Sequence, residues 1–175
     1  MTRPQKPGSL TLHLLRHAKS SWDDPGVADA ARPLAPRGER AARKLARRLT
    51  REGVSPGLVL CSSARRARQT LELIRPALPG APGILVEDGL YAASGRELMA
   101  RLRRVPAGTD EVLLIGHNPG IHDLALALAG DTAPAALREQ FPTGALASLR
   151  FGAVTWADVG PGGGEVIRVL LPRQL

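Results

Sequence analysis

Three short polar segments of this chain combine histidine, arginine and hydroxyl side chains in a way that suits phosphate chemistry. They are RHAKS at residues 16–20, SSARRAR at residues 62–68 and GHNPG at residues 116–120. Arginine forks and the amides at helix N-termini bind tetrahedral dianions. An imidazole placed among such groups can attack phosphorus as a nucleophile. If the fold brings the segments together, His17 and His117 would stand among arginines in one phosphate-binding crevice.

Each polar segment directly follows a short apolar run that predicts a buried β-strand. These runs cover residues 9–15, 58–61 and 111–115, and further strands are expected at 84–86, 146–151 and 166–171. Helices are predicted between them, over residues 36–51, 65–75 and 95–104, and from Pro119 onward. This alternation predicts an α/β fold, a three-layer α/β/α sandwich with a mostly parallel central sheet. Functional groups gather at the carboxyl ends of such strands, so the three segments are expected to meet.

Loop and cap signals refine this organisation. Residues 17–36 are polar and irregular, and a loop of that length in a compact domain is usually functional. Ser62 and Ser63 offer N-cap hydroxyls for the helix over residues 65–75. Gly53 is a natural stop for the helix over residues 36–51, whose apolar residues repeat at helical spacing.

Length and composition favour one cytoplasmic domain. The 175 residues, 43% of them hydrophobic, predict a single domain over residues 1–175, with residues 1–9 as a flexible N-terminus. Residues 1–9 do not resemble a signal peptide, and no run approaches the roughly 20 apolar residues of a membrane span. The single cysteine, Cys61, cannot form an internal disulfide, which fits a reducing compartment. We therefore expect a soluble, cytoplasmic protein without a membrane partner.

The net charge of +8 raises the question of nucleic-acid binding. Basic domains commonly bind phosphate backbones. An aromatic content of 3%, however, leaves little material for stacking bases, and the positive charge is mostly arginine spread over many positions. We interpret the charge as a solvated basic surface that attracts anions in general, and a nucleic-acid partner is not expected.

Five motifs along most of the chain resemble the histidine phosphatase superfamily, and in particular its SixA-type phosphohistidine phosphatase branch. That branch shows RHAKSSW, RPL-x-x-RG, LYxAS, GHNPG and PTG in this order. Here the motifs stand at residues 16–22, 32–38, 90–94, 116–120 and 142–144. Ala18 replaces the glycine usual in the superfamily, and the SixA-type branch accepts alanine there. The resemblance implies a phosphoglycerate mutase-like fold and no metal or other cofactor.

The resemblance also implies roles for individual residues. His17 is the expected nucleophile, Arg16 and Arg66 hold the phosphoryl oxygens, and His117 donates to the same oxygens. The expected phosphate- or substrate-binding residues are Ser20, Arg32 and Trp22. Relatives often use a carboxylate after the third strand as general acid, and the candidates here are Glu87 and Asp88. Because a leaving imidazole has a pKa near ~6.5, a phosphohistidine substrate needs such an acid less than an alcohol ester does.

Three functions follow from these observations and stay open. The leading hypothesis is a metal-independent phosphatase that hydrolyses protein phosphohistidine through a covalent intermediate on His17. Its partner would be a phosphorylated protein, such as a histidine-phosphotransfer domain, or a small phosphorylated compound. The second is a small-molecule phosphomonoesterase or mutase of the same superfamily. The third is a nonenzymatic binder of phosphate or nucleic acid. The oligomeric state is left open.

Several residues near these motifs have simpler interpretations. His13 is expected to be structural, Cys61 to be a small buried residue, and Arg32 either to reach the phosphate or to brace its loop through Asp23 or Asp24. A metal site built from His17, His117, His122 and Asp123 is not expected. His117 and His122 are five residues apart and do not share a helix face as i and i+4 ligands do, which argues against it.

Overall fold

The computed structural model describes residues 8–153 and 155–175, and its centre is a six-stranded sheet. The strands are β1 Leu10–Arg16, β2 Leu58–Ser62, β3 Gly83–Glu87, β4 Glu111–Gly116, β5 Leu146–Phe151 and β6 Gly164–Leu170. Their order is β3-β2-β4-β1-β5-β6. The first four run parallel, whereas β5 pairs antiparallel with β1, and β6 antiparallel with β5. The mostly parallel sheet predicted from the sequence is confirmed.

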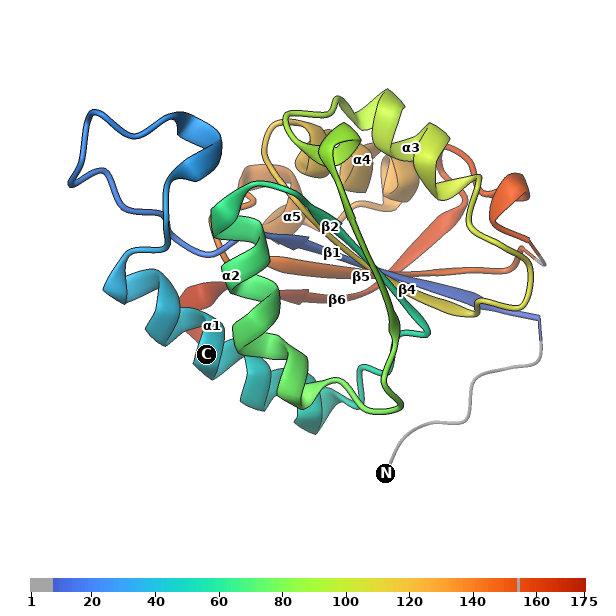
Figure 1. Ribbon diagram of the computed structural model, residues 1–175. Helices are drawn as coiled ribbons and strands as arrows, with labels where there is room; N and C mark the ends of the chain where they lie inside the picture. The colour runs from blue at the N-terminus through green and yellow to red at the C-terminus, as the bar shows by residue number, and fades with distance from the viewer. Residues whose placement is uncertain (1–7, 154) are drawn as a thin grey trace.

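Helices cover both faces of this sheet and complete the predicted three layers (Figure 1). They are α1 Pro36–Glu52, α2 Arg65–Ile74, α3 Gly95–Leu102, α4 Gly120–Ala129 and α5 Ala135–Glu139. One face is covered by α1 and α2, and the other by α3, α4 and α5. Successive side chains of β1 point to opposite faces of the sheet. Leu14 packs in the hydrophobic core under α3 and α4, and Leu15 packs in the core under α1 and α2. The short helix α5 is not among the helices predicted from the sequence.

Helix α1 follows the predicted pattern closely. Its buried residues Ala42, Leu45 and Leu49 repeat every three or four positions and face the sheet. Gly53 ends the helix in the left-handed conformation, with φ 67°, which glycine adopts without steric cost. At the other end, a Cβ on Gly38 would overlap the backbone of Lys19, so the first turn of α1 lies directly against the segment that follows β1.

The cap predicted for α2 is wrong. The N-cap residue of α2 is Ala64, and it makes no side-chain cap hydrogen bond. Ser62 instead ends β2, and its hydroxyl accepts from the Ala64 amide at 3.3 Å. Two residues, 63 and 64, separate the end of β2 from the start of α2, so both serines precede the capping position.

The loop between β1 and α1 is folded back on itself. Ser20 and Leu34 form an isolated antiparallel bridge, and the Ser21 amide donates to the Pro33 carbonyl at 2.8 Å. At its far end, residues Asp29–Ala31 form one 3₁₀ turn. The loop is therefore braced rather than extended. The expectation of a flexible N-terminus concerns residues 1–7 in the main, and these lie outside the described residues.

Two residues in the sheet have the structural roles expected of them. His13 is 2% exposed, and its ring bonds Ser148 Oγ at 2.8 Å and Glu111 Oε1 at 2.9 Å. Cys61 is fully buried in β2, and burial raises the pKa of its thiol to about 12. In the described ranges, none of the helices combines the length and the apolar character needed to cross a membrane.

Candidate active site

The strand order explains why the three polar segments meet. β4 lies between β2 and β1, so the three strands that carry the segments are immediate neighbours. Arg16 is in register with Gly116, and Cys61 with Ile115. The three parallel strands therefore end side by side, and His17, Ser62 and His117 leave the sheet at the same edge.

The ring of His17 is held in one tautomer. Its Nδ1 lies 2.7 Å from the Ala18 carbonyl, which can only accept, so Nδ1 carries the proton. Its Nε2 accepts from Arg66 Nε at 3.3 Å, and so carries the lone pair. Burial is the main cause that lowers the pKa of His17 to about 3, opposed by the Ala18 bond and reinforced by His117, Arg66 and Arg16. The ring is neutral at pH 7 and can act as a nucleophile through Nε2.

Thr70 connects the nucleophile's loop to the arginine on α2. The Ala18 amide donates to Thr70 Oγ1 at 3.0 Å, and this hydroxyl donates to the Arg66 carbonyl at 2.7 Å. Thr70 is fully buried. One hydroxyl thus sets the distance between His17 and Arg66, which gives a physical reason for a threonine four residues after the arginine.

His117 faces His17 across the same arginine. The two ring centroids are 5.0 Å apart. His117 Nδ1 lies 3.4 Å from Arg66 Nη2, which can only donate, so the proton is on Nε2, 2.7 Å from Ser62 Oγ. Burial, then Arg66, lowers the pKa of His117 to about 4. The His117 ring is therefore neutral at pH 7, and its Nδ1 accepts from Arg66.

Arg16 brings a second guanidinium to the group. Its Nη1 donates to the Phe141 carbonyl at 3.0 Å, while its buried Nε has no hydrogen-bond partner among the described residues. Desolvation, with a smaller contribution from Arg66, lowers the pKa of Arg16. A buried donor without an acceptor costs free energy of folding, and a bound phosphoryl oxygen could accept from Arg16 Nε. We call Arg16, His17, Arg66 and His117 the candidate cluster.

Asp29 belongs to the same network, although the sequence did not single it out. Arg66 donates to its carbonyl at 2.6 Å and to its Oδ2 at 3.0 Å. Tyr91 donates its hydroxyl to Oδ2 at 2.6 Å, and Arg32 Nη1 donates to Oδ1 at 3.0 Å. The Tyr91 bond, then Arg66 and Arg32, holds the pKa of Asp29 below its usual value. The only sequence signal was its i,i+3 spacing to Arg32.

Arg32 braces the loop rather than standing free. Its Nε donates to the Ser21 carbonyl at 3.1 Å, and its Nη2 donates to Ser20 Oγ. The carboxylate that it pairs with is Asp29 at 3.0 Å, so the prediction of Asp23 or Asp24 as its partner is wrong. Its Cζ also lies 3.3 Å from the ring centroid of Trp22, which is 70% exposed. Arg32 therefore links Ser20, Trp22 and Asp29.

The two candidates for a general acid lie apart from these contacts. Glu87, the last residue of β3, accepts three hydrogen bonds from Arg101 at 2.7 to 3.1 Å. Those bonds lower the pKa of Glu87, so the carboxylate is ionised and poorly suited to give up a proton. Asp88 begins a 3₁₀ turn and is exposed. Within the described ranges, no group of three or more His, Cys, Asp or Glu side chains is placed to hold a metal ion.

The similarity of this chain to known proteins agrees with the geometry. The model of the histidine phosphatase superfamily (branch 1) matches residues 12–91. An uncharacterized protein of Mycobacterium tuberculosis is 39% identical over 91% of this chain and 100% of its own length. A candidate phosphohistidine phosphatase SixA from Nakamurella multipartitia is 31% identical, with TM-score 0.82 over 96% of this chain and 99% of its own.

A further similar structure contains a bound tungstate. The protein histidine phosphatase SixA complexed with tungstate is 26% identical to this chain, with TM-score 0.77 over 94% of this chain and 98% of its own. The chain therefore belongs to the histidine phosphatase superfamily, and it is a phosphatase. Within that superfamily its fold is similar to those of the SixA proteins.

Proposed function

We propose that the protein hydrolyses phosphohistidine on a protein substrate, with His17 as the covalent nucleophile. The observation that carries this proposal is the position of His17 Nε2. Its lone pair faces the Arg66 guanidinium at 3.3 Å, while Nδ1–H is held by the Ala18 carbonyl. A neutral imidazole with its lone pair beside an arginine fork is suited to attack a phosphoryl group that the fork holds.

The reaction follows in two displacements. His17 Nε2 forms a bond to phosphorus as the bond to the leaving group breaks, and the leaving group takes the electron pair and a proton from solvent. A water molecule then attacks the phosphohistidine, so that inorganic phosphate leaves and the His17 lone pair is restored. Arg16 and Arg66 neutralise the charge on the phosphoryl oxygens in both steps. His117 would donate to these oxygens once the arriving dianion raises its pKa and Nδ1 takes up a proton.

The surroundings of the acidic residues support a nitrogen leaving group. Glu87 is occupied by Arg101, and Asp29 by Tyr91 and two arginines. Both carboxylates are thereby held ionised. An alkoxide needs a proton as it leaves, whereas an imidazole with a pKa of ~6.5 needs less assistance. The names of the similar SixA structures, phosphohistidine phosphatase and protein histidine phosphatase, point to the same substrate class.

Replacing His17 tests the mechanism. His17→Asn should abolish turnover of an aryl phosphate and of a phosphohistidine peptide, yet keep affinity for inorganic phosphate because Arg16 and Arg66 remain. Tungstate, the anion bound by the similar SixA protein, is a suitable second probe of that affinity. His122→Asn is the matched control, since its hydrogen bond to the Leu137 carbonyl at 2.6 Å and its stacking on the Phe141 ring involve no member of the candidate cluster. Full hydrolysis by His17→Asn would refute the mechanism.

A comparison of substrates tests the class of bond that is cleaved. Phosphohistidine peptides should be turned over faster than phosphoserine peptides, sugar phosphates and nucleoside phosphates by the same enzyme preparation. Comparable rates on alkyl phosphate esters would show that the enzyme is a general phosphomonoesterase and would exclude the preference for nitrogen–phosphorus bonds.

A further inference from the structure

The positive charge of the chain is concentrated on one helix. The 17 residues of α1 include seven of the 24 Lys and Arg residues, but two of the 16 Asp and Glu residues. More than half of the net charge of +8 therefore lies on α1. The charge is less evenly spread than the sequence interpretation assumed.

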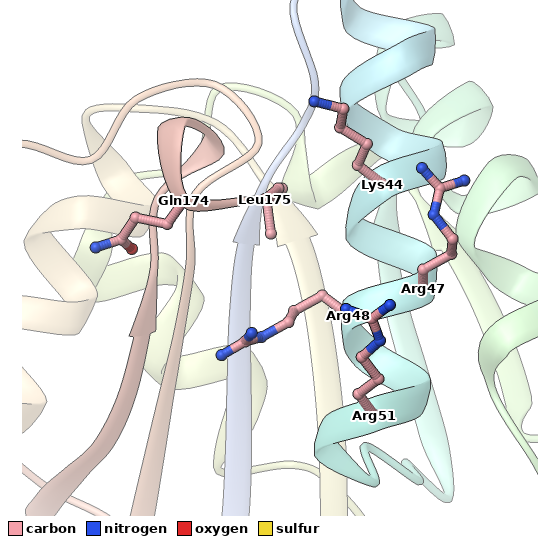
Figure 2. Close-up of a pocket in the computed structure, with 6 residues that line it drawn as sticks. All are labelled: Lys44, Arg47, Arg48, Arg51, Gln174 and Leu175. Atoms are coloured by element: carbon pink, nitrogen blue, oxygen red, sulfur yellow. The ribbon is translucent and has the colours of Figure 1, made fainter.

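These cations share the outer face of α1. At about 100° per residue, all seven fall within an arc of roughly 140°, opposite the buried residues, and Glu39 and Glu52 lie outside that arc. Six of them are exposed: Arg37, Arg40, Arg43, Lys44, Arg47 and Arg51. Figure 2 shows Lys44, Arg47, Arg48 and Arg51 leaving successive turns of the helix beside Gln174 and Leu175.

Among the described residues, most of these cations have no ion-pair partner. Arginines outside α1 do have partners: Arg32 and Arg66 pair with Asp29, and Arg101 pairs with Glu87. On α1, the ion pair found among the described residues is that of Arg48 with Glu52, at 2.8 Å. Like charges three and four residues apart on a helix repel each other. A negatively charged partner bound to α1 would reduce that repulsion.

The basic face begins beside the candidate cluster. The Ala35 amide donates to the Lys19 carbonyl at 2.9 Å, two residues after His17, and Gly38 lies against the Lys19 backbone. Arg37 and Arg40 are thus at the near end of the helix, and Arg51 lies about 21 Å beyond Arg37 at a rise of 1.5 Å per residue. A macromolecule that presents a phosphoryl group to His17 could extend along α1, whereas a small phosphate ester would not reach its far end.

We propose that α1 docks an acidic helix of the phosphorylated protein substrate, through Arg37, Arg40, Lys44, Arg47 and Arg51, here named the basic stripe. This inference rests on the proposed function. The stripe places one cation every three or four residues, about every 5 Å along the helix axis, and carboxylates repeat in the same way on an acidic helix. Duplex DNA carries one charge per about 1.7 Å, which is three times denser than the stripe.

Peptide binding tests the stripe independently of catalysis. The probe is a fluorescent helical peptide of about 20 residues, long enough to span the stripe, with Glu at every third or fourth position. Its twin has Gln at those positions. By anisotropy at low ionic strength, the protein should bind the Glu peptide about tenfold more tightly than the Gln peptide. The double variant Arg40→Glu, Arg47→Glu should bind the Glu and Gln peptides with equal affinity.

A matched variant separates the stripe from general charge. Arg104→Glu with Arg138→Glu makes the same change in charge at exposed positions on the α3–α5 side of the sheet, and should keep the difference. Equal affinity for the Glu and Gln peptides would overturn the proposal. So would equal losses in the two double variants, or tighter binding of a DNA duplex of the same length, which would assign α1 to nucleic acid.

Turnover then connects docking with the reaction. Each peptide now carries a phosphohistidine at one end. The double variant Arg40→Glu, Arg47→Glu should raise KM for the Glu peptide about tenfold and leave KM for an aryl phosphate unchanged. An unchanged KM for the Glu peptide would overturn the stripe while leaving the proposed function intact. If the unaltered protein dephosphorylates neither peptide, the proposed function fails, and the anisotropy result still decides whether α1 binds acidic helices.

Discussion

The Arg66 guanidinium is held by Asp29 on two nitrogens at once, Nη1 to the carbonyl at 2.6 Å and Nη2 to the carboxylate at 3.0 Å. Its remaining Nε points at His17 Nε2 at 3.3 Å. Asp29 comes from the loop after β1 and Arg66 from α2, so the pair joins two segments that are far apart in sequence. The orientation of the Arg66 guanidinium, with Nε toward the nucleophile, is therefore set by an acidic residue that makes no hydrogen bond to the nucleophile.

Asp29→Asn should lower kcat for an aryl phosphate about tenfold. It removes the charge behind the hydrogen bonds from Arg66 and Arg32, and the half-exposed position of Asp29 limits the loss of transition-state stabilisation to about 1.4 kcal/mol. Because Asp29 positions Arg66, KM for the substrate should change less than kcat. Asp23→Asn, on the same loop, is the control and should match the unaltered enzyme. Equal kcat in the two variants would exclude a positioning role.

The His17 ring should be observed by nitrogen-15 NMR as the Nδ1–H tautomer, and it should stay neutral when the pH is lowered from 7 to 5. This follows from its bonds to Ala18 and Arg66 and from a pKa of about 3. Protonation of the ring near pH 6.5, the ordinary value for histidine, would contradict the buried geometry.

The same low pKa predicts how stability depends on pH. The unfolded chain protonates His17 near pH ~6.5 and the folded chain near 3, so the unfolded state binds more protons between these values. The free energy of unfolding should therefore be fully retained above pH ~6.5 and fall as the pH drops toward 3. Urea unfolding at pH 7 and pH 5 measures the difference. His17→Asn should make it smaller, and an unchanged difference would rule out His17 as its source.

Anion binding should be accompanied by proton uptake. His117 is neutral in the described state, with a pKa of about 4, and a phosphate dianion beside it favours the protonated ring. Calorimetric titration with inorganic phosphate at pH 8, where the free phosphate is already mostly the dianion, in two buffers of different ionisation enthalpy, should show uptake of up to about one proton. His117→Gln should reduce it. Binding heats that do not depend on the buffer would oppose a donor role for His117.

Gly38→Ala should destabilise the protein by about 2 kcal/mol, because the added Cβ would overlap the Lys19 backbone. Activity should fall as well, since the displaced segment follows His17 directly. Gly89→Ala is the control, because a Cβ there has no atom within 4 Å. Denaturant unfolding compares the two, and a Gly38→Ala protein as stable as Gly89→Ala would show that the close packing is not required.

The strands and the candidate cluster could be predicted because their signals are local. The apolar runs over residues 9–15, 58–61 and 111–115 are each followed at once by a polar segment, and the three strands end there, at Arg16, Ser62 and Gly116. Asp29 could not be predicted in this way, since Asp23, Asp24 and Asp29 stand in the same loop and only the tertiary position of Arg66 selects one of them. The short helix α5 has five residues, too few for a periodic signal.

The burial of Cys61 affects how the protein would respond to oxidants. This is the chain's one thiol, and with a pKa raised to about 12 it stays protonated, whereas peroxide attacks the thiolate. The proposed nucleophile is a ring nitrogen, which does not undergo the stepwise oxidation of sulfur. Dephosphorylation by this chain should accordingly continue at peroxide concentrations that inactivate enzymes with a catalytic cysteine.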